Sequence, residues 1–301
     1  MLKIKRNLKF LVIAMFFIFI LTIMLGKFWN MDSNFKRILG KSDDNYTSKY
    51  IYVLNREDKS VEYEKNVKTR AYPASLTKIM TTIVALEHID DLSKSVKVDV
   101  KTYKKMVENN SSMAGFYGRE AVTYRDLLYG TILSSGGEAA NSLAVNLAGS
   151  VEDFVSLMNE KASEIGLKDT HFTNPEGLHD NNQYTTAYDM AHLLDYALDN
   201  GDFKAIFTKK TFKTTSTLDH PDGILLRSTV LSKLDNLNKE GFEIIGGKSG
   251  TTYEAGMCWA TLGIKDNQEY ISVVMGADLK DIRNPDMMQI DDTIKLFKRI
   301  N

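Results

Sequence analysis

Strand-like segments at the two ends of the sequence, with helical patterns between them, predict a mixed α/β fold of the α+β kind. Residues 50–54 and 60–64 alternate apolar or aromatic with polar side chains around a polar turn, which indicates a hairpin. Apolar, β-rich segments return only from residue 244 onward. Strands and helices bury their apolar faces against one another. We therefore expect one antiparallel sheet covered by helices, with a helical lobe inserted into it.

The helical patterns begin at Ser75 and continue to about residue 198. After Ser75 the apolar residues recur at helical spacing through about residue 88, which predicts a buried helix, and Pro73 fits its entry. Further helices are expected over residues 124–133, 138–148, 151–165 and 186–198. Later strands are expected from residue 244, over 257–264 and over 270–275, and a closing helix over 286–299.

The composition is that of an ordinary globular protein. The chain has 301 residues, of which 43% are hydrophobic, and a formal net charge of −1, so it can bury a full core. Acidic and basic residues are interspersed after the first nine residues, so binding to nucleic acid is not expected. The single cysteine, Cys258, excludes an intramolecular disulfide and lies in an apolar run, where we expect a packed thiol.

Residues 1–27 have the pattern of a targeting segment. Basic residues precede an apolar run over 10–26, and Lys27 ends the run. No small-residue cleavage site follows, so an uncleaved transmembrane anchor is favoured over a cleaved signal peptide. The basic flank predicts that the N-terminus lies in the cytoplasm and the remainder outside the cell. Residues 28–48 lack apolar periodicity and are expected to form a linker, which leaves 49–301 as the folded domain.

The most informative motif is the Ser-x-x-Lys sequence of residues 75–78, at the start of the first predicted helix. Residues three positions apart on a helix share a face, so the amine of Lys78 can reach the hydroxyl of Ser75. A lysine activates a serine only when it holds no proton, which requires burial or a second cation nearby to lower its pKa. A capping serine beside an exposed lysine is the simpler interpretation of this motif alone. The same spacing at Ser33 and Lys36 lies in the predicted linker, so the spacing needs further support.

Two further segments supply candidate partners for this motif. Ser135, Gly136 and Gly137 form a small-residue turn before a helical pattern, where a helix-capping serine is the simpler interpretation. Lys248 lies on a predicted strand among glycines, which allow a ligand to approach the backbone closely. A solvated lysine at a sheet edge is the simpler alternative there. The three segments together are a much rarer combination than any one of them.

With these motifs the chain resembles the penicillin-binding D-alanyl-D-alanine carboxypeptidases, relatives of the class A β-lactamases. The resemblance covers about residues 48–300 and includes the segments 72–81, 174–180, 184–190 and 247–250. It implies a β-lactamase/DD-peptidase-like fold at the membrane of a bacterial cell. It also implies a serine D,D-carboxypeptidase that removes the terminal D-alanine from peptidoglycan stem peptides through a Ser75 acyl-enzyme. Such an enzyme binds β-lactams covalently and uses no metal or other cofactor.

The resemblance assigns roles to residues of all three motifs. Ser75 would attack the carbonyl of the penultimate D-alanine, and Lys78 would take its proton. Ser135 and Lys248 would pass a proton to the leaving amine, and Lys248 would be the second cation beside Lys78. The amides of Ser75 and Thr251 would form the oxyanion hole. The residues that would contact the substrate are Lys248, Ser249, Thr251, Thr252, Gly137 and Arg283, of which Ser249, Thr252 and Arg283 would hold the terminal carboxylate.

Position 137 departs from the family pattern. The second motif normally reads Ser-x-Asn, whereas this chain has Gly137, so an amide that contacts the substrate and the catalytic lysine is missing. The loss would lower activity, shift substrate preference or be compensated by a neighbour such as Glu138 or Asn141, and the sequence does not choose among these outcomes. Ser249 replaces the commoner threonine and keeps the hydroxyl, so a mild effect is expected.

Two other functions stay open at this point. In a β-lactamase a glutamate activates the deacylating water, and Glu176 is the candidate, although its neighbours match the carboxypeptidase pattern. In a non-catalytic peptidoglycan-binding protein, Gly137 would mark lost chemistry. A zinc carboxypeptidase is not expected, since the five histidines form no compact ligand motif.

Overall fold

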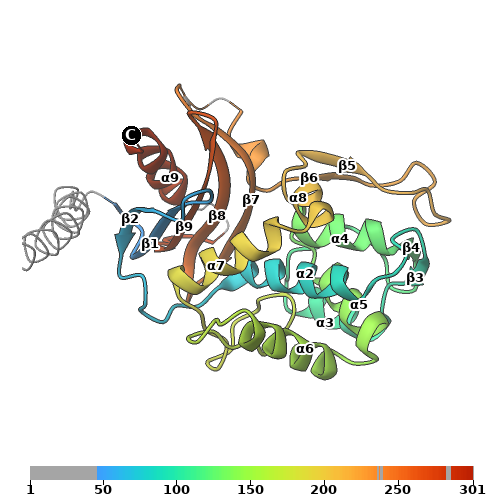
Figure 1. Cartoon of the computed structure of the whole chain (residues 1–301). Helices are drawn as coiled ribbons and strands as arrows, with labels where there is room; N and C mark the ends of the chain where they lie inside the picture. Colours follow the sequence, from blue (N-terminus) through green and yellow to red (C-terminus); the bar gives the residue numbers. More distant parts are fainter. Residues whose placement is uncertain (1–45, 236, 238–239, 283–285, 301) are drawn as a thin grey trace, which may run out of the picture. The chain divides into compact units, whose positions relative to one another are not determined.

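A five-stranded antiparallel sheet runs through the folded part of the chain (Figure 1). The computed structural model describes residues 46–235, 237, 240–282 and 286–300. The sheet contains β1 (Tyr50–Asn55), β2 (Val61–Lys65), β7 (Glu243–Thr252), β8 (Gly256–Lys265) and β9 (Gln268–Ala277), in the order β2-β1-β9-β8-β7. Neighbouring strands are antiparallel throughout. The strands from the two ends of the sequence meet where β1 pairs with β9.

Helices and two small hairpins make up most of the chain between β2 and β7. The helices of the described chain are η1 (Ala74–Thr77), α2 (Lys78–His88), α3 (Val100–Glu108), α4 (Tyr124–Ile132), α5 (Gly137–Ala148), α6 (Val151–Glu164), α7 (Ala187–Leu198), α8 (Gly201–Phe207), η2 (Leu231–Lys233) and the closing α9 (Met288–Arg299). The hairpins pair β3 (Ser95–Lys97) with β4 (Ala121–Thr123) and β5 (Thr211–Lys213) with β6 (Leu225–Arg227). The predicted antiparallel sheet with an inserted helical lobe is confirmed. The prediction from the sequence omits α3, α8 and the two hairpins; α8 and the hairpin strands span only three to seven residues each.

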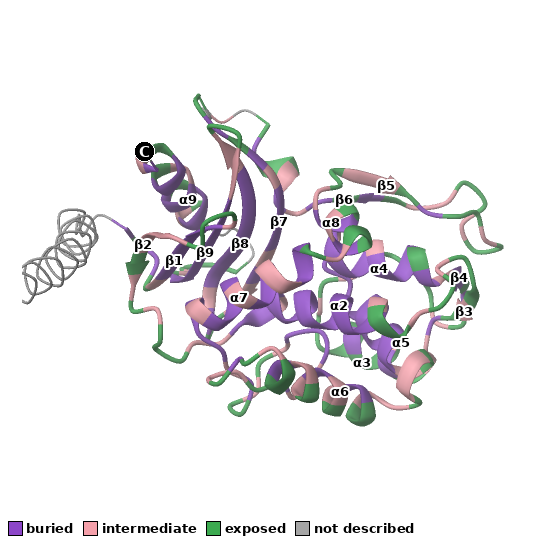
Figure 2. Cartoon of the chain, in the orientation of Figure 1, coloured by how far each residue is buried: buried purple, intermediate pink, exposed green. Residues whose placement is uncertain are grey.

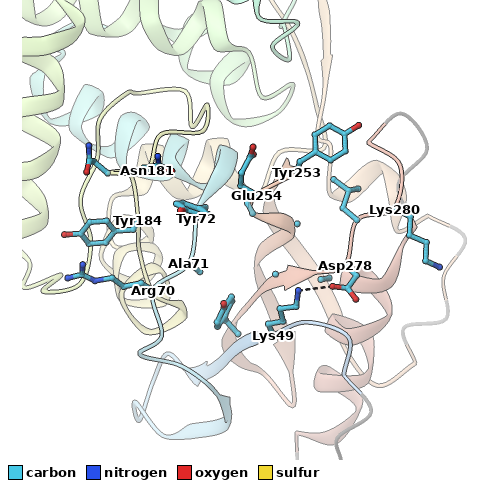
Figure 3. A pocket seen from close by; sticks show the side chains of 17 residues that line it. Lys49, Arg70, Ala71, Tyr72, Asn181, Tyr184, Tyr253, Glu254, Asp278 and Lys280 are labelled. Atoms are coloured by element: carbon cyan, nitrogen blue, oxygen red, sulfur yellow. Dashed lines mark ion pairs between the residues drawn. The ribbon is translucent and has the colours of Figure 1, made fainter.

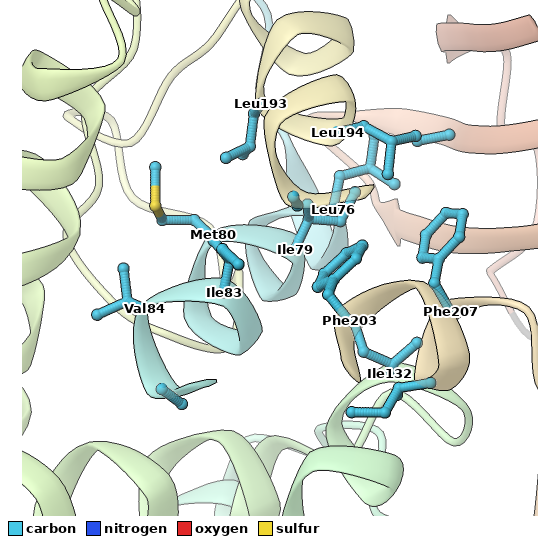
Figure 4. Close-up of a cluster of buried hydrophobic side chains, with 14 of the residues drawn as sticks. Leu76, Ile79, Met80, Ile83, Val84, Ile132, Leu193, Leu194, Phe203 and Phe207 are labelled. Atoms are coloured by element: carbon cyan, nitrogen blue, oxygen red, sulfur yellow. The ribbon is translucent and has the colours of Figure 1, made fainter. Parts of the chain in front are cut away.

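Helix α2 lies inside the larger hydrophobic cluster, which fixes its position (Figure 4). Its residues from Lys78 to Ala85 are all buried. Ile79 and Met80 belong to one cluster with Leu194 of α7 and Phe203 of α8. Figure 2 shows α2 largely buried, whereas α6 carries exposed residues on its outer side. A helix that is buried around most of its circumference is typical of a domain interior, so the turn that precedes it is held by packing.

The two faces of the sheet pack against different helices. Tyr52 and Leu54 of β1 belong to the cluster that contains α2, whereas Ile51 and Val53 belong to a second cluster with Phe297 of α9. Alternate residues of a strand point to opposite faces, so the sheet is covered on both sides. The layers are α9, then the sheet, then α7 with the helical lobe (Figure 1).

The described chain begins at Tyr46. Tyr46 and Ser48 are buried, and the amide of Ser48 donates a 2.7 Å hydrogen bond to Asp292 Oδ2 in α9. The last residues of the predicted linker therefore pack on the folded domain. The predicted anchor, residues 1–27, lies outside the described residues. Among the residues that are described, no helix has the length and apolar character needed to cross a bilayer.

Candidate active site

Ser75 and Lys78 form a first serine–lysine pair where a 3-10 turn joins a buried helix. Ser75 lies in η1, and Lys78 is the first residue of α2. The Nζ of Lys78 lies 3.1 Å from Ser75 Oγ, and it also donates a hydrogen bond to the backbone carbonyl of Glu176. Ala74, directly before the serine, has a φ of 46°. Such strained backbone positions concentrate at functional sites.

Burial sets the proton affinity of Lys78. The residue is 1% exposed, and desolvation lowers the pKa of its amine from 10.5 to about 8. The carboxylates of Glu176 and Glu138 oppose this shift. With a pKa of about 8, roughly one tenth of the amine is neutral at pH 7. The amine can therefore accept the proton of a neighbouring hydroxyl.

Ser135 and Lys248 form a second serine–lysine pair. They are 113 residues apart in the sequence, and Lys248 Nζ donates a 2.9 Å hydrogen bond to Ser135 Oγ. Ser135 precedes α5 with a φ of 59°, and Lys248 lies on β7. Lys248 is fully buried, and desolvation, followed by repulsion from Lys78, lowers its pKa well below the ordinary value. Lys248 thus places a second amine near Lys78, but burial alone lowers the pKa of Lys78, whereas burial and then the charge of Lys78 lower that of Lys248.

Strand β7 lies directly against the backbone of Ser75. A Cβ on Gly250 would lie 2.9 Å from the amide nitrogen of Ser75, so only glycine allows this approach. Thr251 follows on the same strand. The amides of Ser75 and Thr251 therefore belong to two segments in contact, which is the arrangement that an oxyanion hole requires.

The hydroxyls that follow Lys248 along β7 have different environments. Ser249 Oγ lies 2.8 Å from the hydroxyl of Thr229. The Thr252 hydroxyl accepts a hydrogen bond from the amide of Ala255 and so stabilises the turn into β8. The sequence does not indicate Thr229, because this residue lies in a short segment between β6 and η2 that has no pattern of its own.

The loop of residues 174–178 packs against the turn and the helix that carry Ser75 and Lys78. Gly177 has a φ of 86°, and a Cβ there would lie 2.0 Å from the carbonyl oxygen of Ala74, so the loop packs on the serine turn. The Thr81 hydroxyl of α2 donates a 2.6 Å hydrogen bond to the carbonyl of Pro175. These contacts hold the loop against both η1 and α2.

Two of the predicted substrate-binding positions contribute no described side chain. At Gly137, the first residue of α5, a Cβ would lie 2.7 Å from Ser111 Oγ and 2.8 Å from Met106 Sδ. Helix α3 and the residues after it therefore occupy the space that a side chain here would need. Arg283 lies outside the described residues.

A cavity of about 760 Å³ is lined by residues that precede and follow the catalytic segments, but not by Ser75 or Lys78. Figure 3 shows its walls. Tyr72, three residues before Ser75, and Tyr253, directly after β7, line it. Arg70 and Tyr184 form one wall, with the guanidinium carbon 4.1 Å from the ring centroid. The chain just before Ser75 and the chain just after β7 thus both contribute to the walls of this cavity.

Known proteins share the sequence pattern of this chain. The family model for D-alanyl-D-alanine carboxypeptidases matches residues 39–279. The D-alanyl-D-alanine carboxypeptidase DacF of Bacillus subtilis is 31% identical over 261 residues, which make up 84% of this chain and 65% of that protein. The D-alanyl-D-alanine carboxypeptidase of Streptomyces strain K15 is 29% identical over 247 residues, 79% of this chain and 84% of that protein.

The fold is shared as well. The crystal structure of the Streptomyces K15 DD-transpeptidase matches with a TM-score of 0.75 at 27% identity, over 85% of this chain and 97% of that one. The chain spans less than two thirds of some curated relatives, namely 65% of the Bacillus protein and 59% of DacA from Haemophilus influenzae. On its match over most of its length, the chain belongs to the D-alanyl-D-alanine carboxypeptidase family, peptidase family S11.

Proposed function

We propose that this chain is a serine D,D-carboxypeptidase that removes the terminal D-alanine from peptidoglycan stem peptides. The observation that carries the proposal is the presence of two neighbouring serine–lysine pairs, Ser75 with Lys78 at 3.1 Å and Ser135 with Lys248 at 2.9 Å. Acyl transfer from an amide needs a nucleophile with its base and a route for a proton to the leaving nitrogen. Membership of the carboxypeptidase family supports the same reaction.

In the acylation step Ser75 Oγ attacks the carbonyl carbon of the penultimate D-alanine. Because the pKa of Lys78 is about 8, its amine is neutral in a fraction of the molecules, and this neutral amine takes the hydroxyl proton. The amides of Ser75 and Thr251 stabilise the negative charge that develops on the carbonyl oxygen. The bond to the nitrogen of the terminal D-alanine then breaks, and this nitrogen receives the proton through Ser135, which Lys248 holds by a hydrogen bond.

In the deacylation step water hydrolyses the ester on Ser75 and releases the shortened stem peptide. Lys78 lies next to Ser75 Oγ, takes the proton of the attacking water and returns a proton to Ser75 Oγ when the ester bond breaks. Before the reaction, the terminal carboxylate of the substrate binds at the hydroxyls of Ser249 and Thr252, as the family resemblance implies. Thr229 orients the Ser249 hydroxyl from a distance of 2.8 Å.

Incubation with a fluorescent penicillin and with a stem pentapeptide tests this function. We expect a covalent adduct on the wild-type chain that Ser75→Ala lacks, and loss of one alanine from the pentapeptide by mass spectrometry. Circular dichroism checks that the variant is folded. Absence of an adduct on the wild type, or an adduct that survives Ser75→Ala, contradicts the proposal. An unchanged pentapeptide that nevertheless binds would support a non-catalytic peptidoglycan-binding protein.

One observation favours a β-lactamase-type hydrolase as the second candidate. Glu176 is 3% exposed, and its backbone carbonyl accepts a hydrogen bond from Lys78, so a buried glutamate lies beside the catalytic candidates. A glutamate activates the deacylating water in class A β-lactamases. Rapid turnover of penicillin would support this candidate, whereas slow release of a stable adduct supports the carboxypeptidase.

The cavity that Tyr72 and Tyr253 line is proposed to receive the part of the stem peptide that precedes the terminal alanines. It begins at Tyr253, where β7 ends, which supports a peptide that continues along this strand. The side chain of Arg70 stacks on Tyr184, lies 3.7 Å from Asp169 Oδ1 and stays 59% exposed, so its remaining donors can bind a peptide carboxylate. Arg70→Met should then weaken pentapeptide binding by about two- to fivefold. Acylation by penicillin, which lacks the peptide, should not change, and an equal loss with both would contradict this assignment.

Residues 1–27 are proposed to anchor the enzyme in the cell membrane, with the folded domain outside the cell beside its substrate. The basic flank and the apolar run over residues 10–26 support this topology. Carbonate-washed membranes from cells that express the full chain should retain the protein, and protease added to intact protoplasts should digest the domain. A mature N-terminus beyond residue 27 would support a cleaved signal peptide instead.

A further inference from the structure

We propose that Asn141 and Glu176 form a positioning pair that holds Lys78 in place, a task for which position 137 offers no side chain. The inference rests on the proposed serine chemistry, because the position of Lys78 matters to catalysis only if this amine is the base.

The position of the Lys78 amine depends on the loop of residues 174–178. Besides its contact with Ser75 Oγ, the Nζ donates a hydrogen bond to the backbone carbonyl of Glu176. Lys78 and Glu176 are 1% and 3% exposed, so water does not compete for this hydrogen bond. Any group that fixes Glu176 therefore also fixes the amine.

Asn141 connects the side chain of Glu176 to helix α5. Its Nδ2 donates hydrogen bonds to Glu176 Oε2 at 3.1 Å and to the carbonyl of Gly137 at 2.9 Å. Asn141 is 3% exposed, and a buried polar group that loses its partner is costly. One buried amide thus joins the first turn of α5 to the loop that holds Lys78.

The packing around Gly137 explains why this amide comes from position 141. Met106 is fully buried, and its Sδ lies 2.8 Å from the place of a Cβ on Gly137 and 3.6 Å from Asn141 Nδ2. The site therefore has no room for an asparagine at 137 unless Met106 and Ser111 move. Asn141 lies one turn further along α5, on the same face as Gly137. The amide of the second motif is thus displaced by one helical turn.

Glu138, the other candidate for compensation, has a different task. Its Oε1 accepts hydrogen bonds from the backbone amides of residues 114–116, at 2.7, 2.9 and 3.3 Å. A buried carboxylate with these partners fixes the loop in front of α5. Asn141 is therefore the neighbour that reaches the catalytic lysine, through Glu176.

The charge of Glu176 gives the positioning pair a measurable signature. Among the described residues, the charged groups that face Lys78 are Glu176 from the loop, Glu138 from α5 and Lys248 from β7. Glu176 is the larger of the two carboxylate influences that favour the ammonium form of Lys78. Removal of its charge should lower the pKa of Lys78. A change in packing alone would alter the rate without moving the pH dependence.

Acylation of the full chain by a fluorescent penicillin, measured between about pH 6 and pH 9, tests the proposal. In Glu176→Gln, which keeps the shape, the acidic limb of the rate profile should move to lower pH by about half a unit to one unit. Burial raises the pKa of Glu176, and the hydrogen bond from Asn141 limits this rise. Asn141→Leu should therefore make Glu176 easier to protonate and cause a smaller shift in the same direction. In Asn141→Leu the acylation rate at the plateau should be roughly tenfold lower, since the Lys78 amine is less well held. In the double variant the shift caused by Asn141→Leu should vanish.

Asn146→Leu is the matched control. Asn146 lies on the same helix and also donates a hydrogen bond to the carbonyl four residues before it, that of Ser142 at 2.7 Å, but it is exposed and its second acceptor is the Lys97 carbonyl. This variant should keep the wild-type profile.

Three results would overturn the positioning role. They are an unmoved acidic limb in Glu176→Gln, an equal shift from Asn141→Leu in both backgrounds, and slower release of the penicillin adduct without a shifted limb. The last result would assign Glu176 to the deacylating water. Absence of any adduct on the wild-type chain would remove the proposed function itself, so the two failures are distinguishable.

Discussion

The two serine–lysine pairs of this site are built in different ways. Ser75 and Lys78 lie three positions apart, and the geometry of one helical turn brings their side chains together. Ser135 and Lys248 come from a helix entry and a strand that are 113 residues apart. They meet because β7 packs beside the helical lobe. The first pair therefore depends mainly on local geometry, and the second depends on the whole fold.

The protonation of one lysine nevertheless affects the protonation of the other. Both lysines are buried, and the charge on Lys78 lowers the pKa of Lys248. Coulomb repulsion acts in both directions, so a proton on one amine disfavours a proton on the other. The two pairs form independently but are thus linked through the charges of their lysines. A substitution can disrupt the contact within one pair, the electrostatic coupling between the two lysines, or both.

Removal of the two hydroxyls should separate the pairs most strongly. Ser75→Ala removes the atom that forms the covalent bond, so no penicillin adduct is expected. Ser135→Ala leaves nucleophile and base in place, so acylation should continue about 10²- to 10⁴-fold more slowly, the usual contribution of a proton-transfer group. Time-resolved fluorescence on gels measures both rates. Complete loss in both variants would show that the pairs act as one unit.

The pH dependence of acylation should follow Lys78. Its pKa is about 8 and only the neutral amine accepts a proton, so the rate should rise about tenfold per pH unit below this value and level off above it. A rate that is constant between about pH 6 and pH 8 would exclude Lys78 as the base.

The difference between the pairs also explains what the sequence predicts. The spacing of Ser75 and Lys78 predicts their contact, because the helical repeat alone places them on one face. The order of strand and helix patterns likewise predicts the sheet and the inserted lobe. The contact of Ser135 with Lys248 follows from no spacing rule, and only the family resemblance indicates it.

Other features of the site depend on tertiary packing that local patterns do not describe. Thr229 and Ser249 are 20 residues apart, and Asn141 and Glu176 are 35 apart, so no periodicity links the partners. The crowded space at position 137 is filled in part by α3, a helix that the sequence does not predict. A missing side chain is visible in the sequence, but the neighbour that replaces it is visible only in the fold.

Substitution of Gly177 tests whether the contact between Ser75 and Lys78 depends on the loop of residues 174–178. A Cβ there would lie 2.0 Å from the carbonyl oxygen of Ala74, so Gly177→Ala must move the loop away from the serine turn. Gly166 is the matched control, since its φ is 80° against 86° and no described atom lies within 4 Å of its Cβ position. Both variants should lose about 1 to 2 kcal/mol in the left-handed conformation. Gly177→Ala should lose about 2 kcal/mol more and acylate roughly tenfold more slowly.

Urea unfolding and acylation rates measure this difference. Equal stability and equal rates in the two glycine variants would show that the loop can move without disturbing Lys78. The first pair would then be local in the strict sense, and helix geometry alone would maintain it.

The smallest expected effect concerns the surroundings of the second pair. Thr229 Oγ1 lies 2.8 Å from the hydroxyl of Ser249, the residue after Lys248. Thr229→Val keeps the shape and removes this hydrogen bond, so the KM for a peptide with a free terminal carboxylate should rise about fivefold, equivalent to about 1 kcal/mol. An unchanged kcat would assign the hydroxyls to binding of the carboxylate. Ser249→Ala should add little in the Thr229→Val background, because the two hydroxyls act together. A fall in kcat without a rise in KM would instead connect Thr229 to proton transfer at Ser135. The proton-transfer group would then include Thr229 in addition to Ser135 and Lys248.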